Sequence, residues 1–328
     1  MTDTRNQCIA HWVDRVLGQG VLLTPLAGDA SFRRYLRAQR GEGTGSERWV
    51  VMDAPPAKES VVPFLQVRRW LESLDLRVPA LVAADEAVGL LLLEDFGDTT
   101  WAQARDQGRA VAPLFADAVR QLHLLQAGDA SALHSPCFDH ARMARECALY
   151  LDWYLPFVAQ REVDARFRAN FFAALEPLFE QIARIPQAPV HLDYHSRNLM
   201  LPDDAVPLGV IDFQDACLGP ITYDLSSLIY DCYQDYGLTQ PLAVSEGFYH
   251  ALPARFHSAF ADAEAWHQAL LATSLQRHIK VCGIFARLAF RDGKTQFLQA
   301  LPQTRRHLLF ELDALEMTDA LRAPLAFE

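Results

Sequence analysis

Two aspartates and an asparagine are spaced in this chain as phosphoryl-transfer chemistry requires. They lie in His191-Leu-Asp-Tyr-His-Ser-Arg-Asn198 and in Ile211-Asp212-Phe213. Transfer of a phosphoryl group from ATP needs one carboxylate to orient and deprotonate the attacking hydroxyl. It also needs an amide oxygen and a second carboxylate to hold Mg²⁺. We therefore expect Asp193 to act as the base, and Asn198 and Asp212 to bind Mg²⁺.

Short apolar segments flank these residues and would position them. Residues 189–192, 198–201 and 208–213 are each typical of a short strand. Pro202-Asp203-Asp204 predicts a turn between the last two. A hairpin of this kind would bring the asparagine and the second aspartate together, while the preceding loop presents the first aspartate.

Two other interpretations of this segment stay open. The three polar residues could be ordinary turn and strand-end residues, where Asp and Asn are common. A zinc site is the second alternative, because His191, Asp193 and His195 alternate as neighbours on one face of a strand would. A catalytic zinc would leave Asn198 and Asp212 without a role, which favours the magnesium interpretation.

Length and composition are those of a globular protein with room for two lobes. The chain has 328 residues, of which 51% are hydrophobic and 22% charged. No apolar run is long enough for a membrane span, and the first residues lack the pattern of an export signal. Six cysteines without C-x-x-C spacing favour reduced thiols in a cytoplasm. The net charge of −11 argues against nucleic acid or an anionic membrane as partner.

The pattern of elements changes near residue 98. Before it, helices are expected at 7–18 and 60–74, and strands at 21–26, 32–38, 48–53, 79–83 and 89–94. After it, the pattern is mainly helical, interrupted by the hairpin. We therefore expect an α+β fold with a small β-rich lobe (residues 1–97) and a larger, mainly helical lobe (residues 98–328).

Nucleotide contacts are expected at two places in the first lobe. Gly28, Asp29, Ala30 and Ser31 form a small polar turn between two strands, where backbone N–H groups could approach a phosphate closely. A plain hairpin turn would have the same sequence.

Residues 90–97 change abruptly from a buried strand to polar residues, as a link between lobes would. The backbone carbonyl of Glu94 and the N–H of Phe96 are candidates for contacts with adenine. An edge strand that ends in a turn is the alternative.

These motifs together resemble the aminoglycoside phosphotransferase and choline kinase group of the protein-kinase-like fold. The matching stretches are Gly28–Ser31, Leu93–Gly97, His191–Asn198, Ile211–Phe213 and Tyr223–Leu225. The resemblance implies a two-lobed fold and an ATP- and Mg²⁺-dependent kinase that acts on a small-molecule hydroxyl. It also implies structural roles beside the site for His191 and Asp224, with Asp224 holding the catalytic loop through hydrogen bonds.

Two further stretches, Val50–Pro56 and Gln276–Lys294, resemble a bacterial subgroup of amino-sugar kinases. That resemblance implies phosphorylation of the anomeric 1-hydroxyl of N-acetylmuramate or N-acetylglucosamine, giving a sugar 1-phosphate in peptidoglycan recycling. A kinase for an aminoglycoside, a choline-like molecule or another small alcohol is the alternative within the same reaction class.

The chain departs from kinases of this fold at the third strand. They usually carry a lysine there, whereas this sequence has Val50-Val51-Met52-Asp53. Lys58, Arg33 or Arg34 could supply the missing charge to the phosphates of ATP. Alternatively, the protein binds nucleotide as a regulatory module and turns over slowly or not at all.

Contacts to the acceptor are expected from the second lobe. His195, Gln214 and Asp215 could donate to or accept from sugar hydroxyls. Arg277, Lys280 and Arg287 fall within one arc of a helix expected at about 270–290. We expect Arg287 to suit a carboxylated sugar, although such basic faces are commonly only solvated.

Overall fold

The computed structural model describes residues 2–26, 33–133, 135–202, 205 and 207–325, without the side chains of residues 2, 3, 44 and 132. By their contacts, these residues divide into two compact units. The first comprises residues 1–99 and 200–214, and the second comprises residues 100–199 and 215–328. Residues 200–214, which we expected in the second lobe, thus belong by their contacts to the same unit as residues 1–99.

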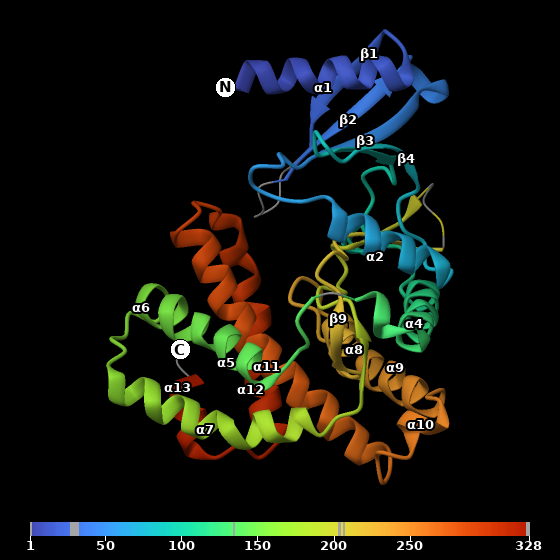
Figure 1. Cartoon of the computed structure of the whole chain (residues 1–328). Helices are drawn as coiled ribbons and strands as arrows, with labels where there is room; N and C mark the ends of the chain where they lie inside the picture. The colour runs from blue at the N-terminus through green and yellow to red at the C-terminus, as the bar shows by residue number, and fades with distance from the viewer. Residues whose placement is uncertain (1, 27–32, 134, 203–204, 206, 326–328) are drawn as a thin grey trace. The chain divides into compact units, whose positions relative to one another are not determined.

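The first unit is built on an antiparallel sheet (Figure 1). Its strands occur in the order β1-β2-β3-β5-β4. The elements of this unit are α1 (Thr2–Leu17), β1 (Val21–Pro25), β2 (Arg34–Arg40), η1 (Gly43–Gly45), β3 (Glu47–Asp53), α2 (Val62–Ser73), β4 (Leu81–Asp85), β5 (Leu90–Glu94) and β8 (Gly209–Val210). The helices and strands expected here are all present, with ends that differ by a few residues.

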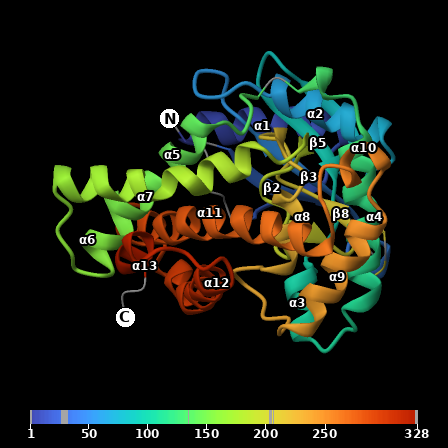
Figure 2. The same cartoon turned by 90° about the horizontal axis from the view of Figure 1, so that it is seen from below.

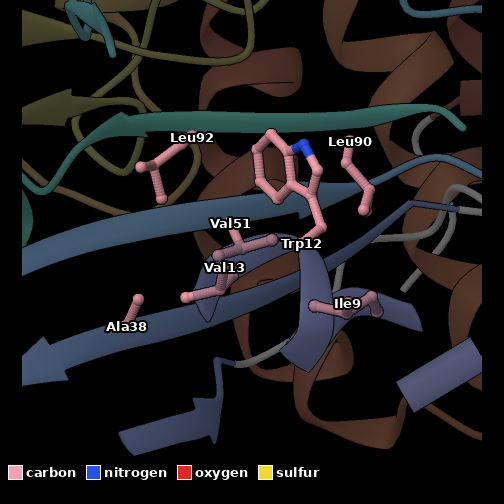
Figure 3. Close-up of a cluster of buried hydrophobic side chains, with 7 residues drawn as sticks. All are labelled: Ile9, Trp12, Val13, Ala38, Val51, Leu90 and Leu92. Carbon is pink, nitrogen blue, oxygen red and sulfur yellow. The ribbon is translucent and has the colours of Figure 1, made fainter. Parts of the chain in front are cut away.

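The amphipathic face of α1 covers one face of this sheet. Ile9, Trp12 and Val13 of the helix pack against the strands in a buried hydrophobic cluster (Figure 3). Val51 of β3 belongs to this cluster. Its neighbour Met52 lies outside the cluster and is also fully buried. Since side chains alternate along a strand, the sheet is buried on both faces at β3.

The second unit is mainly helical. Its elements are α3 (Trp101–Asp106), α4 (Ala112–Ala127), η2 (Ala130–Ala132), α5 (His140–Leu149), the π-helix η3 (Tyr150–Tyr154), α6 (Leu155–Phe157), α7 (Ala165–Ala183), β6 (Gln187–Val190), β9 (Cys217–Pro220), α8 (Tyr223–Ile229), α9 (Thr239–His250), α10 (Ala254–His257), α11 (Ala263–Phe290), η5 (Thr295–Ala300), α12 (Leu301–Ala314) and α13 (Asp319–Leu325). The division between the units falls within β7 (Leu199–Met200), which pairs with β8. Among the helices of the described residues, none combines the length and the apolar character needed to cross a bilayer.

The long helix α11 forms the centre of the second unit and contacts α5, η3, α7, α8 and α12 (Figure 2). Gly283 allows its close approach to the junction of α5 and η3, since a Cβ at this position would lie 2.3 Å from the carbonyl carbon of Leu149, the last residue of α5. This close approach fixes the position of α11 within the second unit. It thereby also fixes the positions of the basic residues Arg277 and Lys280, which α11 carries.

Candidate active site

The loop that carries Asp193 connects β6 to β7 and is held by a buried carboxylate. Asp224 accepts the backbone N–H groups of His191 at 2.6 Å and Leu192 at 2.9 Å. Leu192 adopts a left-handed backbone conformation with φ 78°, which is strained for a leucine. The surrounding contacts must impose this conformation, and it directs the chain toward Asp193.

A second buried carboxylate holds the other end of the loop. Asp231 accepts the backbone N–H of Ser196 at 2.8 Å and that of Tyr233 at 2.6 Å. Asp224 and Asp231 lie at the start of α8 and just past its end, and both are fully buried. The sequence prediction included Asp224 and missed Asp231. A second Asp in the mainly apolar segment 223–232, which has no other charged residue, is the signal that could have revealed it.

Within the loop, hydrogen bonds fix the orientation of Asn198. Its Nδ2 donates to the backbone carbonyl of Asp193 at 2.9 Å, and its N–H donates to the carbonyl of His195 at 2.9 Å. The amide oxygen is thus the end of the side chain that can face a cation. His191 is buried, and its Nδ1 accepts the N–H of Asp193 at 3.2 Å.

Positive charges keep Asp193 ionised. Burial disfavours its charged form, but the charges of Lys280, His195, His191 and Arg277 outweigh burial and lower the pKa of Asp193. A carboxylate that is ionised at neutral pH can accept a hydrogen bond from a hydroxyl and then its proton.

The expected arc of basic residues on α11 has two parts. Arg277 is buried and donates to the sulfur of Cys232 at 3.5 Å. Lys280 is also largely buried, and neither residue is merely solvated. Arg287 lies two turns beyond Lys280, and its pKa is lowered first by burial and then by repulsion from Arg291. Its contact with the substrate stays a prediction.

Aromatic contacts support the exposed side of the loop. The guanidinium of Arg197 lies 3.7 Å from the ring centre of Tyr233, and the ring of His195 meets the same tyrosine edge-on at 5.3 Å. Tyr233 in turn packs against Phe285 of α11. His195, which we predicted to contact the acceptor, is partly exposed. Its ring contacts Tyr233, which itself packs on α11.

The other predicted magnesium ligand, Asp212, follows β8 in the first unit. It has a left-handed backbone with φ 64°, and its Oδ1 accepts from Nε2 of Gln214 at 2.8 Å. Phe213 is fully buried and packs on Phe64 of α2, with ring centres 4.9 Å apart. The hydrogen bond from Gln214 and the packing of Phe213 therefore fix the direction of the Asp212 carboxylate. Carboxylate oxygens are donors that Mg²⁺ prefers.

An arginine lies against the same face of α2. Arg33 is 8% exposed, forms an ion pair with Glu59 at 2.5 Å, and lies 5.9 Å from the ring centre of Phe64. Phe64 thus touches both Arg33 and the residue that follows Asp212. Lys58, the neighbour of Glu59, is exposed in the turn before α2.

The aspartate at the position of the usual kinase lysine has a structural role. Asp53 is fully buried and accepts two hydrogen bonds from each of Arg5 and Arg34. It faces its partner Arg34 across β2 and β3, on the face covered by α1. Two guanidinium groups neutralise this buried carboxylate, and Arg34 is committed to it.

The expected adenine-binding link is anchored within the first unit. The carboxylate of Glu94 binds Arg77 at 2.7 Å and the N–H of Ala80 at 3.1 Å. The ring of Phe96 packs between the Arg77 guanidinium, 4.7 Å away, and Gly209, where a Cβ would lie 2.3 Å from the ring. The link and β8 therefore hold each other in place. The phosphate-binding turn Gly28–Ser31 lies outside the described residues.

The zinc alternative is not supported. Among the described residues, no group of three or more His, Cys, Asp or Glu side chains is arranged to hold a metal ion. In addition, Nδ1 of His191 accepts the backbone N–H of Asp193, so this nitrogen is not available as a metal ligand.

The structure therefore assembles the predicted residues in two groups. In the second unit, Asp193 and Asn198 lie together with His191, His195 and Asp224. In the first unit, Gln214 donates to Asp212, and Phe213 between them packs on Phe64 of α2. Their convergence stays a prediction, as do the roles of Arg33, Lys58, Glu94, Phe96, Gln214, Arg287 and the exposed Asp215. Residues that we did not predict are Asp231 and Glu59, together with Glu146 and Tyr223, which hold Lys280 at 3.3 and 3.2 Å.

Comparison with known proteins identifies the family. The profile of the Phosphotransferase enzyme family matches residues 22–266. The chain belongs to this family. It is 35% identical to the N-acetylmuramate/N-acetylglucosamine kinase of Pseudomonas putida, over 92% of this chain and 90% of that protein. It is also 35% identical to the kinase of the same name from Neisseria meningitidis, over 87% and 84%.

Solved structures of other phosphotransferases have the same fold. A choline/ethanolamine kinase family protein from Mesorhizobium loti superposes with a TM-score of 0.63 at 14% identity, covering 99% of this chain and 98% of that one. A streptomycin–ATP–APH(2'')-IIa ternary complex superposes with a TM-score of 0.54 at 17% identity, covering 90% and 97%. The expected two-lobed, kinase-like α+β fold is confirmed, and the protein is a phosphotransferase that acts on a small-molecule hydroxyl.

Proposed function

We propose that this protein is an ATP- and Mg²⁺-dependent kinase that phosphorylates the anomeric 1-hydroxyl of N-acetylmuramate and N-acetylglucosamine. The observation that carries the proposal is the 35% identity, over 92% of the chain, to a kinase named for these two sugars. The product would be a sugar 1-phosphate, consistent with a role in cell-wall recycling. A cytoplasmic location remains a prediction.

In the proposed reaction, Asp193 accepts a hydrogen bond from the sugar hydroxyl and aligns its oxygen for in-line attack on the γ-phosphorus of ATP. The new O–P bond forms as the bond to the β,γ-bridging oxygen breaks, and the hydroxyl proton passes to Asp193. An anomeric hydroxyl is more acidic than an ordinary alcohol, so a carboxylate with a lowered pKa is a sufficient base.

Asn198 and Asp212 are the proposed ligands of Mg²⁺, which would neutralise the charge that develops on the phosphate oxygens. The oriented amide of Asn198 and the carboxylate of Asp212 supply the oxygen donors that Mg²⁺ prefers. Gln214 would keep Asp212 in the orientation for this contact.

Arg33 is our candidate for the charge that kinases usually place on the third strand. In that fold a strand lysine grips the phosphates and pairs with a glutamate. Here Arg33 pairs with Glu59 and packs on α2, whereas Arg34 is committed to Asp53. We expect Arg33→Met to raise the KM for ATP strongly, and Lys58→Met to raise it less. An unchanged KM in the Arg33 variant would assign the phosphate contact elsewhere.

The electrostatics of the second unit argue against a polycationic acceptor. Lys280 and Arg277 both act on Asp193 with positive charge, and they would repel an aminoglycoside. They suit a neutral or carboxylated sugar better.

An acceptor panel tests the proposal. ADP release would be followed with N-acetylmuramate, N-acetylglucosamine, an aminoglycoside and choline, and the product would be located by phosphorus NMR. Phosphate at C1 of the two N-acetylated sugars is the expected result. Turnover with only an aminoglycoside or choline would reassign the acceptor. Nucleotide binding without ADP release from any acceptor would indicate a regulatory module.

A further inference from the structure

Arg197 is an exposed arginine of the catalytic loop, directly before Asn198. Its Cζ lies over the ring of Tyr233, 3.7 Å from the ring centre. At this separation the guanidinium lies on the face of the ring, so the N–H groups in its own plane stay available for another partner. Within the part of the chain that the structure describes, the side chain of Arg197 forms no hydrogen bond or ion pair. A positive charge of the loop is thus held in place and open to a ligand.

One buried carboxylate fixes Arg197 against Tyr233. Asp231 accepts the backbone N–H of Ser196, the residue before Arg197, at 2.8 Å with one oxygen, and that of Tyr233 at 2.6 Å with the other. The ring of Tyr233 also packs on Phe285 of α11, with ring centres 5.6 Å apart. The loop and the ring are therefore held together without any ligand, and the guanidinium has its position before an acceptor binds.

The same ring connects Arg197 to the surroundings of the proposed base. His195 meets Tyr233 edge-on at 5.3 Å. The backbone carbonyl of Asp193 accepts the N–H of His195 at 3.1 Å and the Nδ2 of Asn198 at 2.9 Å. The residues on either side of Arg197 are thereby folded back on Asp193, so an acceptor bound at Asp193 lies beside this part of the loop.

We propose that Arg197, held on the ring of Tyr233, binds the lactyl carboxylate of N-acetylmuramate and so determines the preference between the two amino sugars. This inference rests on the proposed function and adds the residue that recognises the difference between its two acceptors. N-acetylmuramate is N-acetylglucosamine with a lactyl ether on O3, and this ether carries a carboxylate. A guanidinium binds a carboxylate through two parallel N–H···O bonds, and a guanidinium that is already positioned loses little freedom in doing so.

The experiment compares the two sugars in the same protein. Arg197→Met removes the guanidinium and keeps an apolar side chain on Tyr233. We expect the KM for N-acetylmuramate to rise about 10–100-fold, because charge-assisted hydrogen bonds are lost. The KM for N-acetylglucosamine, which has no carboxylate, should stay as in the wild type. A disturbance of the neighbouring Asn198 would affect both sugars alike, so the ratio of their kcat/KM values isolates the contact with the carboxylate.

Two further variants and the ionic strength sharpen the comparison. Arg197→Lys keeps the charge without the planar fork and should restore part of the preference. Arg166→Met, at an exposed position of α7, is the matched control and should leave both KM values unchanged. Added salt should raise the wild-type KM for N-acetylmuramate more than that for N-acetylglucosamine, because it screens exposed charges. This difference should disappear in Arg197→Met.

Three results would overturn the inference. The first is an equal change, or no change, for the two sugars in Arg197→Met. The second is a selective loss for N-acetylmuramate in Arg287→Met with none in Arg197→Met, which would return the contact to α11. The third is a wild-type protein that phosphorylates N-acetylglucosamine and not N-acetylmuramate. Turnover of neither sugar would overturn the proposed function and this inference with it, so the two failures are distinguishable.

Discussion

Asp224 Oδ1 accepts the N–H of Leu192 at 2.9 Å, at the residue where the chain turns left-handed before Asp193. The strained residue and the buried carboxylate thus stabilise each other. Burial raises the pKa of Asp224 to about 6, although the two N–H donors and the charge of His191 favour its ionised form. The loop therefore has its geometry before any substrate binds, as a catalytic carboxylate requires.

Replacement of Asp224 by Asn is the first prediction. An amide has one acceptor oxygen and would turn an NH₂ group toward one of the two N–H donors. We expect the free energy of unfolding to fall by about 1–3 kcal/mol, because a buried N–H is left unsatisfied. The kcat should fall with it, and urea unfolding and ADP release measure the two effects. Asp14→Asn, at an exposed position of α1, should change neither. Wild-type stability and kcat in the Asp224 variant would contradict the proposed role.

Gly283 gives a prediction whose sign is opposite to the usual one. Glycine to alanine within a helix commonly stabilises it by about 0.5–1 kcal/mol. At Gly283 the added Cβ meets backbone atoms of Leu149 and Tyr150 at 2.3–2.5 Å, and backbone cannot rotate away. We therefore expect Gly283→Ala to destabilise by about 1–3 kcal/mol and to lower kcat, because α11 carries Lys280.

Gly247 of α9 supplies the matched control for this change. It is also in a helix, but nothing lies within 4 Å of a Cβ added there. Gly247→Ala should raise the melting temperature. Equal changes in melting temperature for the two variants would contradict the argument from the approach of α11 to η3.

A buried ion pair makes stability depend on pH. His278 of α11 binds both carboxylate oxygens of Glu311 at 2.8 and 2.9 Å, and its Nε2 binds the carbonyl of Tyr230 at 3.0 Å. Burial lowers the pKa of His278, but Glu311 and Cys232 outweigh it and raise the pKa to about 10. The stacked ring of His307 has its pKa lowered to about 3, by burial and by His278, and so stays neutral.

Because the pKa of His278 is higher in the folded protein, its contribution to stability is complete below pH 6.5 and is lost as the pH rises through about 10. We expect the free energy of unfolding to decrease from pH 7 to pH 10. His278→Gln should abolish most of this slope, which urea unfolding at several pH values would measure. Parallel slopes in the two proteins would show that the pair does not titrate as described.

Local patterns in the sequence were sufficient to predict the fold class and the loop around Asp193. The segments 21–26 and 48–53 form strands in which alternating residues, among them Leu23 and Val51, pack against α1. Asp193 and Asn198 are five residues apart, and their contact is local. Such features follow from spacing along the chain alone.

Contacts between distant segments could not be predicted in the same way. Asp231 reaches Ser196 across 35 residues, and Glu146 reaches Lys280 from another helix. The usual lysine position is occupied by Asp53, whose partner Arg5 comes from α1. Nothing local in the sequence specifies these pairs, because they depend on how helices and strands pack.

The Asp193→Asn variant tests the central claim most directly. It keeps the size of the side chain and removes the charge and the basicity, while nucleotide binding relies on other residues. We predict that kcat for N-acetylmuramate falls about 10²–10⁴-fold and that the affinity for ATP, measured by calorimetry, is nearly unchanged. A variant that retains more than about a tenth of the wild-type kcat would contradict the assignment of Asp193 as the base.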